Sequence, residues 1–244
     1  MLPRILETEA MDTLAEAVDY DSMDHREVNR VFVADLLATR RGEKGDRPHL
    51  PERPEGCFAQ MGPVPFWEGW ILDLGTGTAQ IPVELCRQDP RAKVLAIDAA
   101  EHMLRLARKN IEQAGLSDRI RVERVDAKRL PYADGSFATV VSNSIVHHIP
   151  EPTEVLAEAW RVLAPAGLIF IRDLFRPNDE AALRRLVETY AAGASQHQKQ
   201  MLADSFHAAL TVEEVRQIVT RFGVLPETVR ATSDRHWTWA ARKR

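Results

Sequence analysis

Short apolar runs alternate with amphipathic segments from residue 70 onward, and no other feature of the sequence constrains the fold as strongly. Apolar runs of this kind are typical of strands that are covered on both faces, and such strands lie in parallel sheets flanked by helices. The sequence therefore predicts an α/β domain built on a largely parallel sheet. Its strands are expected at residues 71–74, 94–97, 120–125, 137–142 and 168–171, with two more at 228–231 and 236–241.

Helices are expected between and after these strands, and capping residues mark several of their ends. Gly115 fits the C′ position of one helix, and Asn178 is a candidate N-cap for another. Thr211 and Glu214 form a capping-box pattern that opens a later helix, which Gly223 should end. Apolar residues at helical spacing predict the remaining helices at 78–87, 101–114, 152–163 and 197–209.

The chain before residue 66 has a different character. Residues 8–38 carry a patchy apolar face at helical spacing, and a break near residues 19–24 predicts two helices. Residues 40–65 are first rich in charge and then rich in proline, which removes hydrogen-bond donors and fixes φ. This stretch therefore predicts a long loop, and loops of this length are either lids or disordered. Its prolines are Pro48, Pro51, Pro54, Pro63 and Pro65.

The composition argues against several classes of function. Lys and Arg total 32 and Asp and Glu total 36, so a net charge of −4 gives no basic field for nucleic acid or for an anionic membrane. Cys57 and Cys86 form no CxxC pair, so we predict no zinc site, no redox dithiol and no bound metal. No apolar run approaches the ~18 residues of a membrane span. Residues 1–12 lack the apolar core of a signal peptide, which makes a cytoplasmic protein the simplest expectation.

A glycine-containing turn follows the first predicted strand. Asp73 precedes Gly75 and Gly77, and these glycines let the backbone turn sharply into the next helix and let a ligand approach it closely. Asp98 ends the next strand, 21 residues after Gly77. A carboxylate at that place reaches the ribose hydroxyls of a nucleotide held over the turn. An accidental Gly-x-Gly is the alternative, and the two flanking carboxylates make it the weaker interpretation.

The type of nucleotide follows from what the turn lacks. A dinucleotide fingerprint requires a third glycine, because the pyrophosphate sits on the helix N-terminus, and Gln80 occupies that place. S-adenosylmethionine carries no phosphate, and its ammonium and sulfonium groups suit an acidic residue such as Asp73. A nicotinamide-dependent oxidoreductase therefore remains only as an alternative.

More polar residues follow the third and fourth predicted strands. Asp126 ends the third strand, where it either accepts from an adenine amino group or is a solvated turn residue. Asn143 and Ser144 end the fourth strand, and His147 and His148 follow them. Open α/β sheets bind ligands at the carboxyl ends of their strands, so these side chains are expected to lie at the ligand.

These motifs, in this order, resemble those of the class I S-adenosylmethionine-dependent methyltransferases, in the ubiquinone-biosynthesis-like group that acts on small molecules. The resemblance is strong over residues 70–175 and weak over the C-terminal strands. It implies a Rossmann-like three-layer α/β/α sandwich whose seven-stranded, mostly parallel sheet has an antiparallel last strand. The motifs that carry it are Asp73–Gly77, Asp98, Val125–Ala127, Asn143–Pro150 and Arg161–Gly167.

The resemblance also implies a cofactor, an acceptor class and a division of labour along the chain. S-adenosylmethionine would bind to residues 67–244, while residues 1–66 supply N-terminal helices and a lid loop, and 178–210 form a helical insertion that shapes the acceptor pocket. The family motif for adenine or glutamine methylation is absent at 143–146, which leaves oxygen, sulfur, carbon and other nitrogen acceptors open. The residues expected to bind the cofactor are Asp73, Gly75, Thr76, Gly77, Asp98, Ala99, Met103, Asp126, Ala127, Asn143 and Ser144.

The sequence offers candidates for proton transfer but names no acceptor. Methyl transfer needs a base only for a protonated acceptor, and imidazole titrates near neutral pH. We expect His147 to line the acceptor pocket, and His148 to point away into the protein body, although either could be purely structural. A non-catalytic cofactor-binding subunit remains an alternative, and the sequence does not indicate the oligomeric state. Weaker candidates are Arg172 and Asp173 beside the acceptor and Tyr20 and Asn29 over the cofactor, where ordinary helix-surface positions are the favoured interpretation.

Overall fold

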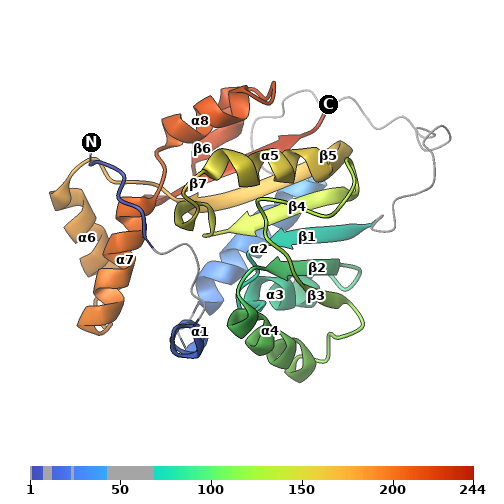
Figure 1. Cartoon of the computed structure of the whole chain (residues 1–244), viewed down its shortest axis with the longest axis horizontal. Coiled ribbons are helices and arrows are strands. Elements are labelled where there is room, and N and C mark those ends of the chain that lie inside the picture. The colour runs from blue at the N-terminus through green and yellow to red at the C-terminus, as the bar shows by residue number, and fades with distance from the viewer. Residues whose placement is uncertain (1, 8–12, 23–24, 43–68) are drawn as a thin grey trace.

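The computed structural model describes residues 2–7, 13–22, 25–42 and 69–244. Its centre is a seven-stranded sheet in the order β3-β2-β1-β4-β5-β7-β6, in which β7 runs antiparallel to both of its neighbours (Figure 1). This arrangement confirms the predicted Rossmann-like fold and its antiparallel last strand. The strands are β1 (Trp70–Leu74), β2 (Lys93–Asp98), β3 (Ile120–Arg124), β4 (Phe137–Asn143), β5 (Leu163–Leu174), β6 (Val229–Ala231) and β7 (His236–Arg242).

Helices cover both faces of the sheet, as the apolar runs require. Alternate residues of β1 point to opposite faces, so Ile71 packs with α2, α3 and α4 whereas Leu72 packs with α5 and α8. The covering helices are α2 (Arg26–Arg41), α3 (Gln80–Gln88) and α4 (Glu101–Gln113) on one face and α5 (Pro152–Val162) and α8 (Val212–Thr220) on the other. Because Phe32 and Leu36 of α2 are wholly buried, this N-terminal helix belongs to the main core.

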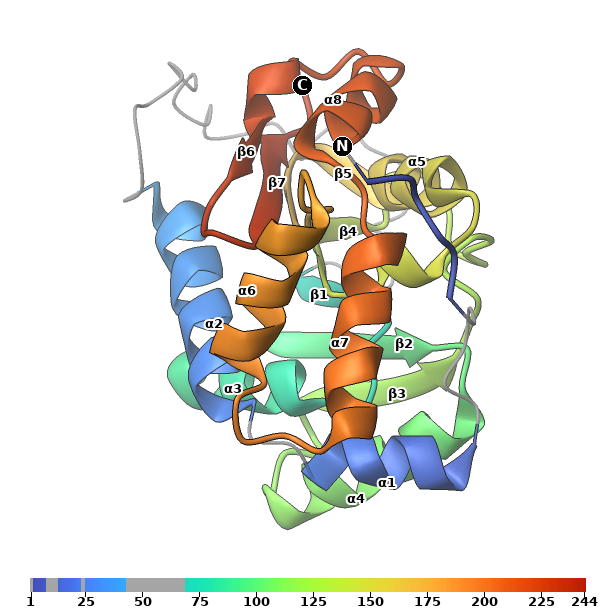
Figure 2. The same ribbon diagram turned by 90° about the vertical axis from the view of Figure 1, so that its left-hand side faces the viewer.

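The remaining helices lie beyond the carboxyl ends of the parallel strands. Helices α6 (Glu180–Tyr190) and α7 (Gln196–Ala208) pack against each other there, and α1 (Leu14–Ser22) packs against the start of α4 (Figures 1 and 2). Two short 3-10 helices, η1 (Val146–His148) and η2 (Pro226–Thr228), complete the described elements. This edge of the sheet is therefore covered by elements that are distant from one another in sequence.

Several predicted boundaries were wrong for identifiable reasons. Strand β5 extends well beyond 168–171, because it pairs with β4 on one side and with β7 on the other. The cap of α6 is Asp179 rather than Asn178, and its side chain accepts from the Ala182 amide. Helix α3 begins at Gln80, two residues later than expected, because Ala79 has a left-handed conformation with φ of +61°.

The N-terminal predictions have mixed outcomes. The expected break between two helices is confirmed, but α2 continues to Arg41, inside the range predicted as loop. From residue 43 to 68 the predicted proline-rich loop lies outside the described residues, as do residues 8–12. Residues 2–7, called here the N-terminal strap, run along α7 and η1, where the Ile5 amide donates to the His207 carbonyl. No helix among the described residues is both long enough and apolar enough to span a lipid bilayer.

Candidate functional site

The glycine turn joins β1 to α3 and is held by the end of β2. Gly75 and Gly77 both have positive φ, at +65° and +55°, which glycine adopts without steric cost. The Thr76 amide donates to the Ile97 carbonyl at 2.8 Å, and the Gly77 amide donates to Asp98 Oδ2 at 2.8 Å. These hydrogen bonds fix the turn and the Asp98 carboxylate relative to each other.

The two glycines are required for different reasons. A Cβ atom on Gly75 would lie 2.2 Å from the Ile145 side chain, so Ile145 already occupies the space that any larger residue would need. A Cβ atom on Gly77 would meet only Tyr20, at an ordinary contact distance of 3.7 Å. Gly75 therefore allows η1 to approach β1, whereas Gly77 faces the side from which α1 covers the turn.

A small cavity opens beside the turn and contains buried polar atoms with unused hydrogen-bonding capacity. Asp73 Oδ2 and the hydroxyls of Thr76 and Thr78 are buried and have no hydrogen-bond partner among the described residues. Burial is the main cause that raises the pKa of Asp73 to about 7; the Thr76 hydroxyl nearby opposes the shift, and the negative charge of Asp98 adds to it. An ammonium group at this place would supply the missing donors. The cavity is lined by Tyr20, Asn29, Asp73, Gly75, Thr76, Thr78, Gln80, Ile81 and Asn143.

Asp98 lies at the end of β2, between the glycine turn and the N-terminus of α4. Its Oδ1 atom accepts from the Ala100 amide at 2.9 Å, while Oδ2 accepts from Gly77. Burial nevertheless raises the pKa of Asp98, against the effect of these hydrogen bonds. Each carboxylate oxygen keeps one lone pair free, which leaves Asp98 able to accept from two further hydroxyls.

The other predicted cofactor residues fall into two groups. Asn143 lines the cavity. Met103 lies at the start of α4, where it is buried against α1. Ser144 adopts φ of +59° and donates its amide to the Arg172 carbonyl. Ala127 is half-buried against the core below the strand ends. These positions surround the cavity without all touching it.

Asp126 and Ala99 lie at the surface. The Asp126 side chain is 51% exposed, forms an ion pair with Lys128 at 3.2 Å and accepts from the Lys128 amide. This geometry matches the solvated-turn alternative for Asp126. Ala99 is exposed, and its carbonyl accepts from Arg124 at 3.0 Å. Neither residue lines the cavity beside the glycine turn.

Two N-terminal residues cover the cavity, contrary to the favoured interpretation that they are ordinary surface positions. Asn29 on α2 donates to the Gln80 side chain at 3.2 Å, and Gln80 donates to Asp21 on α1 at 3.4 Å. Burial raises the pKa of Tyr20 to about 12, and the negative charges of Asp98, Asp73 and Asp21 add to this effect. Gln80 stood out in the sequence only as the place of a missing glycine, and Thr78 carried no signal.

On the other side of the turn, η1 presents a buried histidine–aspartate pair. His147 Nδ1 is 2.5 Å from Asp173 Oδ1, and Asp173 Oδ2 accepts from the Val146 and His147 amides at 2.6 and 3.3 Å. Burial disfavours a charge on His147, but the Asp173 carboxylate outweighs it and raises the pKa of His147. Burial likewise opposes the charge on Asp173, and His147 outweighs it and lowers the pKa of Asp173. Hydrogen bonds therefore hold His147 and Asp173 in a fixed geometry at the end of β5.

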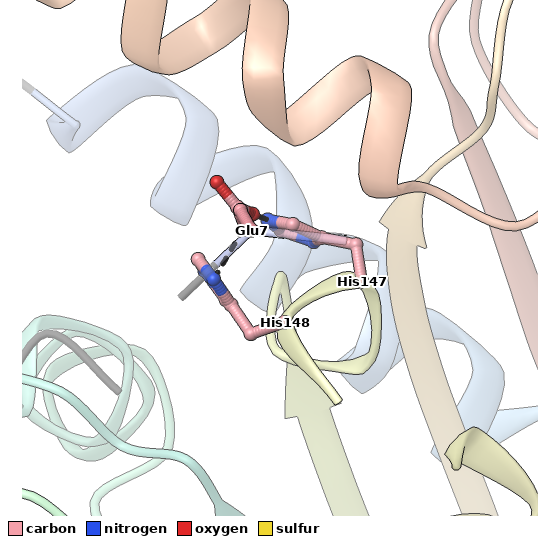
Figure 3. Close-up of side chains that lie close together, drawn as sticks. All are labelled: Glu7, His147 and His148. Atoms are coloured by element: carbon pink, nitrogen blue, oxygen red, sulfur yellow. Dashed lines mark ion pairs between the residues drawn. The ribbon is translucent and has the colours of Figure 1, made fainter. Parts of the chain in front are cut away.

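The predicted orientation of His148 was wrong. The two imidazole rings lie side by side, with centroids 4.1 Å apart, and both point toward Glu7 of the N-terminal strap (Figure 3). Glu7 Oε1 is 3.0 Å from His148 Nδ1 and 3.4 Å from His147 Nε2. Glu7 had no recognisable signal in the sequence.

Arg172 has a structural position. Its guanidinium donates to Asp35 at 2.8 Å and to the Thr238 hydroxyl at 2.9 Å, and it lies over the rings of Phe32 and Phe170. These contacts join α2 to β5 and β7 on the face of the sheet that α2 covers. The prediction of an acceptor-side role for Arg172 is therefore not supported, whereas Asp173 lies beside the histidine pair.

Comparison with known proteins finds similarity to methyltransferases over part of the chain. Residues 71–167 match the family model for a methyltransferase domain. A demethylmenaquinone methyltransferase of Deinococcus radiodurans is 37% identical over 107 residues, which cover 44% of this chain and 44% of that protein. A malonyl-[acyl-carrier protein] O-methyltransferase of Geobacter sulfurreducens is 35% identical over 153 residues, covering 63% of this chain and 54% of that protein. The chain thus spans about half the length of the curated relatives it matches.

The fold comparison extends over nearly the whole chain. A structure from Methanococcus maripaludis, assigned to the S-adenosyl-L-methionine-dependent methyltransferases, superposes with a TM-score of 0.64 at 18% identity and covers 98% of this chain and 97% of its own. At that identity the likeness concerns the fold alone. Residues 71–167 are therefore similar in sequence to a methyltransferase domain, and the chain shares its fold with a structure assigned to the S-adenosyl-L-methionine-dependent methyltransferases.

Proposed function

We propose that this protein transfers a methyl group from S-adenosylmethionine to a small-molecule acceptor. The observation that carries the proposal is the buried, unpartnered Asp73 carboxylate oxygen beside a glycine turn that is bonded to Asp98. S-adenosylmethionine has an ammonium group that Asp73 could bind and two ribose hydroxyls that Asp98 could bind. The polar groups of the site therefore fit the cofactor.

The residues of the site would bind and align the reactants. When bound, S-adenosylmethionine supplies an electrophilic methyl group on a sulfonium. Asp73 would hold the ammonium, Asp98 the ribose hydroxyls, and Asn143 would stand at the end of β4 between cofactor and acceptor. Tyr20 and Asn29 close the cavity from the N-terminal helices, which would keep water away from the cofactor. Positioning of this kind supplies most of what an in-line displacement needs.

The acceptor would lie beyond η1, where α7 and the N-terminal strap form the outer wall. Arg4 of the strap donates to the carbonyls of Ile149, Pro150 and Ala208, so the strap is attached to both η1 and α7. His147 could remove a proton from a hydroxyl or thiol acceptor only after Glu7 has moved, because Glu7 faces His147 Nε2. The names of the two relatives give different acceptors, demethylmenaquinone and malonyl-[acyl-carrier protein]. We therefore propose only that the acceptor is a small acyl or ring compound.

A nicotinamide-dependent reaction fits the same cavity poorly. The Gln80 side chain occupies the start of α3 through its contacts with Asn29 and Asp21, where a pyrophosphate would have to sit. The Asp73 carboxylate lies next to that place and would repel phosphate groups. A non-catalytic cofactor sensor has the same binding site as an enzyme, so only a turnover measurement separates the two.

Calorimetry and a turnover assay test the proposal in sequence. Titration of the full chain with S-adenosylmethionine, its demethylated product and NAD should show binding of the first two and none of the third. An acceptor panel of hydroxynaphthoquinones, catechols and malonyl thioesters should then release the demethylated product with at least one compound. Binding of NAD without binding of S-adenosylmethionine would overturn the cofactor assignment. Cofactor binding with no product release from any acceptor would favour the sensor.

A further inference from the structure

We propose that Glu7, His147 and His148 form a binding site for a divalent transition-metal ion such as Zn²⁺. Each residue offers one donor atom, and these three atoms all lie within 4.8 Å of one another (Figure 3). Zinc binds imidazole nitrogen at ~2.0–2.1 Å and carboxylate oxygen at ~2.0–2.2 Å, so one ion between the three donors needs only small side-chain rotations. The proposal concerns metal binding and does not depend on methyl transfer.

The first supporting feature is the orientation of His147. Its Nδ1 atom is engaged by Asp173, so in the neutral ring Nδ1 carries the proton and Nε2 presents a lone pair toward Glu7. A metal-binding histidine almost always donates its other ring nitrogen to a carboxylate or a carbonyl, which fixes the tautomer and raises the basicity of the ligand. Asp173 is wholly buried and also accepts from three backbone amides, so this arrangement is rigid before any ion arrives.

The second feature is the set of unused donor atoms. Glu7 Oε1 and His148 Nδ1 are both buried and lie 3.0 Å apart, in an ion-pair contact that lacks the alignment of a good hydrogen bond. A cation bound between the two atoms would interact favourably with both. A single shared proton would not, because the two atoms are not aligned for a hydrogen bond.

The charges around the cluster favour a divalent ion. Glu7 and Asp173 supply two carboxylates, whose combined charge one divalent cation balances. The nearest basic side chain on the strap is Arg4, and its guanidinium is used by backbone carbonyls of η1 and α7. Two imidazoles and one carboxylate match the ligand set of catalytic zinc sites, which keep a fourth position open. Mg²⁺ and Ca²⁺ prefer oxygen ligands and are a poor match.

The position of the cluster suggests what the open ligand position could hold. Ile145 at the start of η1 packs against Gly75, so the end of η1 next to the cluster adjoins the cavity beside the glycine turn. In the metal-loaded protein His147 Nε2 is a ligand and cannot be a base. If the proposed methyl transfer is correct, the open position would instead receive an oxygen atom of the acceptor.

The prediction of no metal site rested on the absence of a CxxC pair. That argument does not apply to this cluster, which contains no cysteine. Its ligands come from the N-terminal strap and from η1, and Asp173 comes from β5. Only the folded chain brings them together.

Metal titration of the chelator-treated, tag-free full chain tests the proposal. Calorimetry with ZnCl₂ should show one ion bound per chain, with a Kd of about 1 μM or tighter. Glu7→Gln and His148→Asn should each weaken binding by at least about 100-fold, and Asp173→Asn by about 10- to 100-fold, as expected of a group that orients a ligand. His197→Asn and Glu188→Gln, at exposed positions on α7 and α6, are matched controls and should bind as the unaltered protein does.

A second measurement guards against misfolded variants. Co²⁺ added to the unaltered chain should give the visible absorption of a four- or five-coordinate site with nitrogen ligands, and ZnCl₂ should abolish it. Each variant should still bind S-adenosylhomocysteine, which reports on the fold and on the cofactor site separately. Absence of stoichiometric Zn²⁺ binding, or equal binding by Glu7→Gln and the controls, would overturn the proposal. Loss of metal binding with intact S-adenosylhomocysteine binding would leave the methyltransferase proposal standing.

Discussion

The glycine turn after β1 and the histidine pair after β4 lie at the same edge of the sheet, but they are assembled from different parts of the chain. Asp73, Gly75 and Thr76 share one turn, and Asp98 ends the neighbouring strand. On the other side, Glu7, His147 and Asp173 come from the N-terminal strap, from η1 and from β5. The proposed cofactor side is therefore a local structure, and the proposed acceptor side is a tertiary one.

The two regions also differ in how their carboxylates are satisfied. Asp73 is buried without a partner for Oδ2, and burial raises its pKa to about 7. Asp173 is buried as deeply, but His147 and backbone amides surround it and its pKa is lowered. A bound cation would therefore supply the charge partner that Asp73 lacks, whereas His147 and the backbone amides already compensate the charge of Asp173. This difference predicts opposite responses to substitution.

The largest effect is expected from the histidine pair. His147→Ala leaves the Asp173 carboxylate buried without its imidazole, and breaking a buried pair in this way costs about 3–5 kcal/mol of unfolding free energy. His148 is more exposed and its partner Glu7 can turn to solvent, so His148→Ala should cost about 1 kcal/mol or less. Urea unfolding with a chelator present measures both. A larger cost for His148→Ala would mean that it, rather than His147, is the structural residue.

The next effect separates the two glycines of one turn. Gly75→Ala adds a left-handed alanine and a clash with Ile145, and we expect a loss of about 3 kcal/mol or more in unfolding free energy. Gly77→Ala adds the same backbone strain without the clash and should cost about 1–2 kcal/mol. Denaturant unfolding of the cofactor-free proteins gives both values. Equal costs would show that η1 moves easily away from β1.

The third effect concerns binding on the cofactor side. Asp98→Ala should weaken binding of S-adenosylhomocysteine by about 2–3 kcal/mol, because charge-assisted hydrogen bonds to two hydroxyls are lost. The matched change Asp126→Ala should cost less than about 1 kcal/mol, because this side chain is exposed and already bonded within its own turn. Calorimetry at one pH compares them. Similar losses for both variants would place the adenosine closer to β3 than the described cavity does.

The smallest effect is a pH dependence that only the cofactor side should show. Because Asp73 has a pKa of about 7 without ligand, binding of a cationic ligand below that pH requires loss of its proton. The affinity for S-adenosylmethionine should therefore fall by up to about tenfold per pH unit below pH 7 and be flat just above it. Asp73→Asn should abolish this slope. A slope that persists in Asp73→Asn would assign the proton to another group.

The same raised pKa has a consequence for stability with a definite sign. Asp73 has a higher pKa in the folded than in the unfolded protein, so its favourable contribution is complete at acid pH. That contribution is lost as the pH rises from about 4 to about 7. Asp73→Asn should accordingly raise the free energy of unfolding at pH 8 more than at pH 5 in the cofactor-free protein. Unfolding curves at the two pH values provide the check.

The sequence by itself determined the order of strands and helices and the cofactor turn. The apolar runs predicted all seven strands, and the motif spacing predicted that Asp98 lies beside the glycine turn, where its carboxylate accepts from the Gly77 amide. Both inferences depend on residues that are close in sequence or in adjacent parallel strands, where geometry follows from the periodicity of the chain. The capping box at Thr211 is confirmed for the same reason.

Only the tertiary structure decided how the far side of the site is assembled. The length of β5 depends on β7, which follows it by more than sixty residues, and the place of Tyr20 over the cavity depends on how α1 packs on α4. Glu7 reaches the two imidazoles because the strap is attached to α7 and η1. No local pattern encodes such contacts, because they depend on which surfaces remain to be buried once the sheet and its helices have formed.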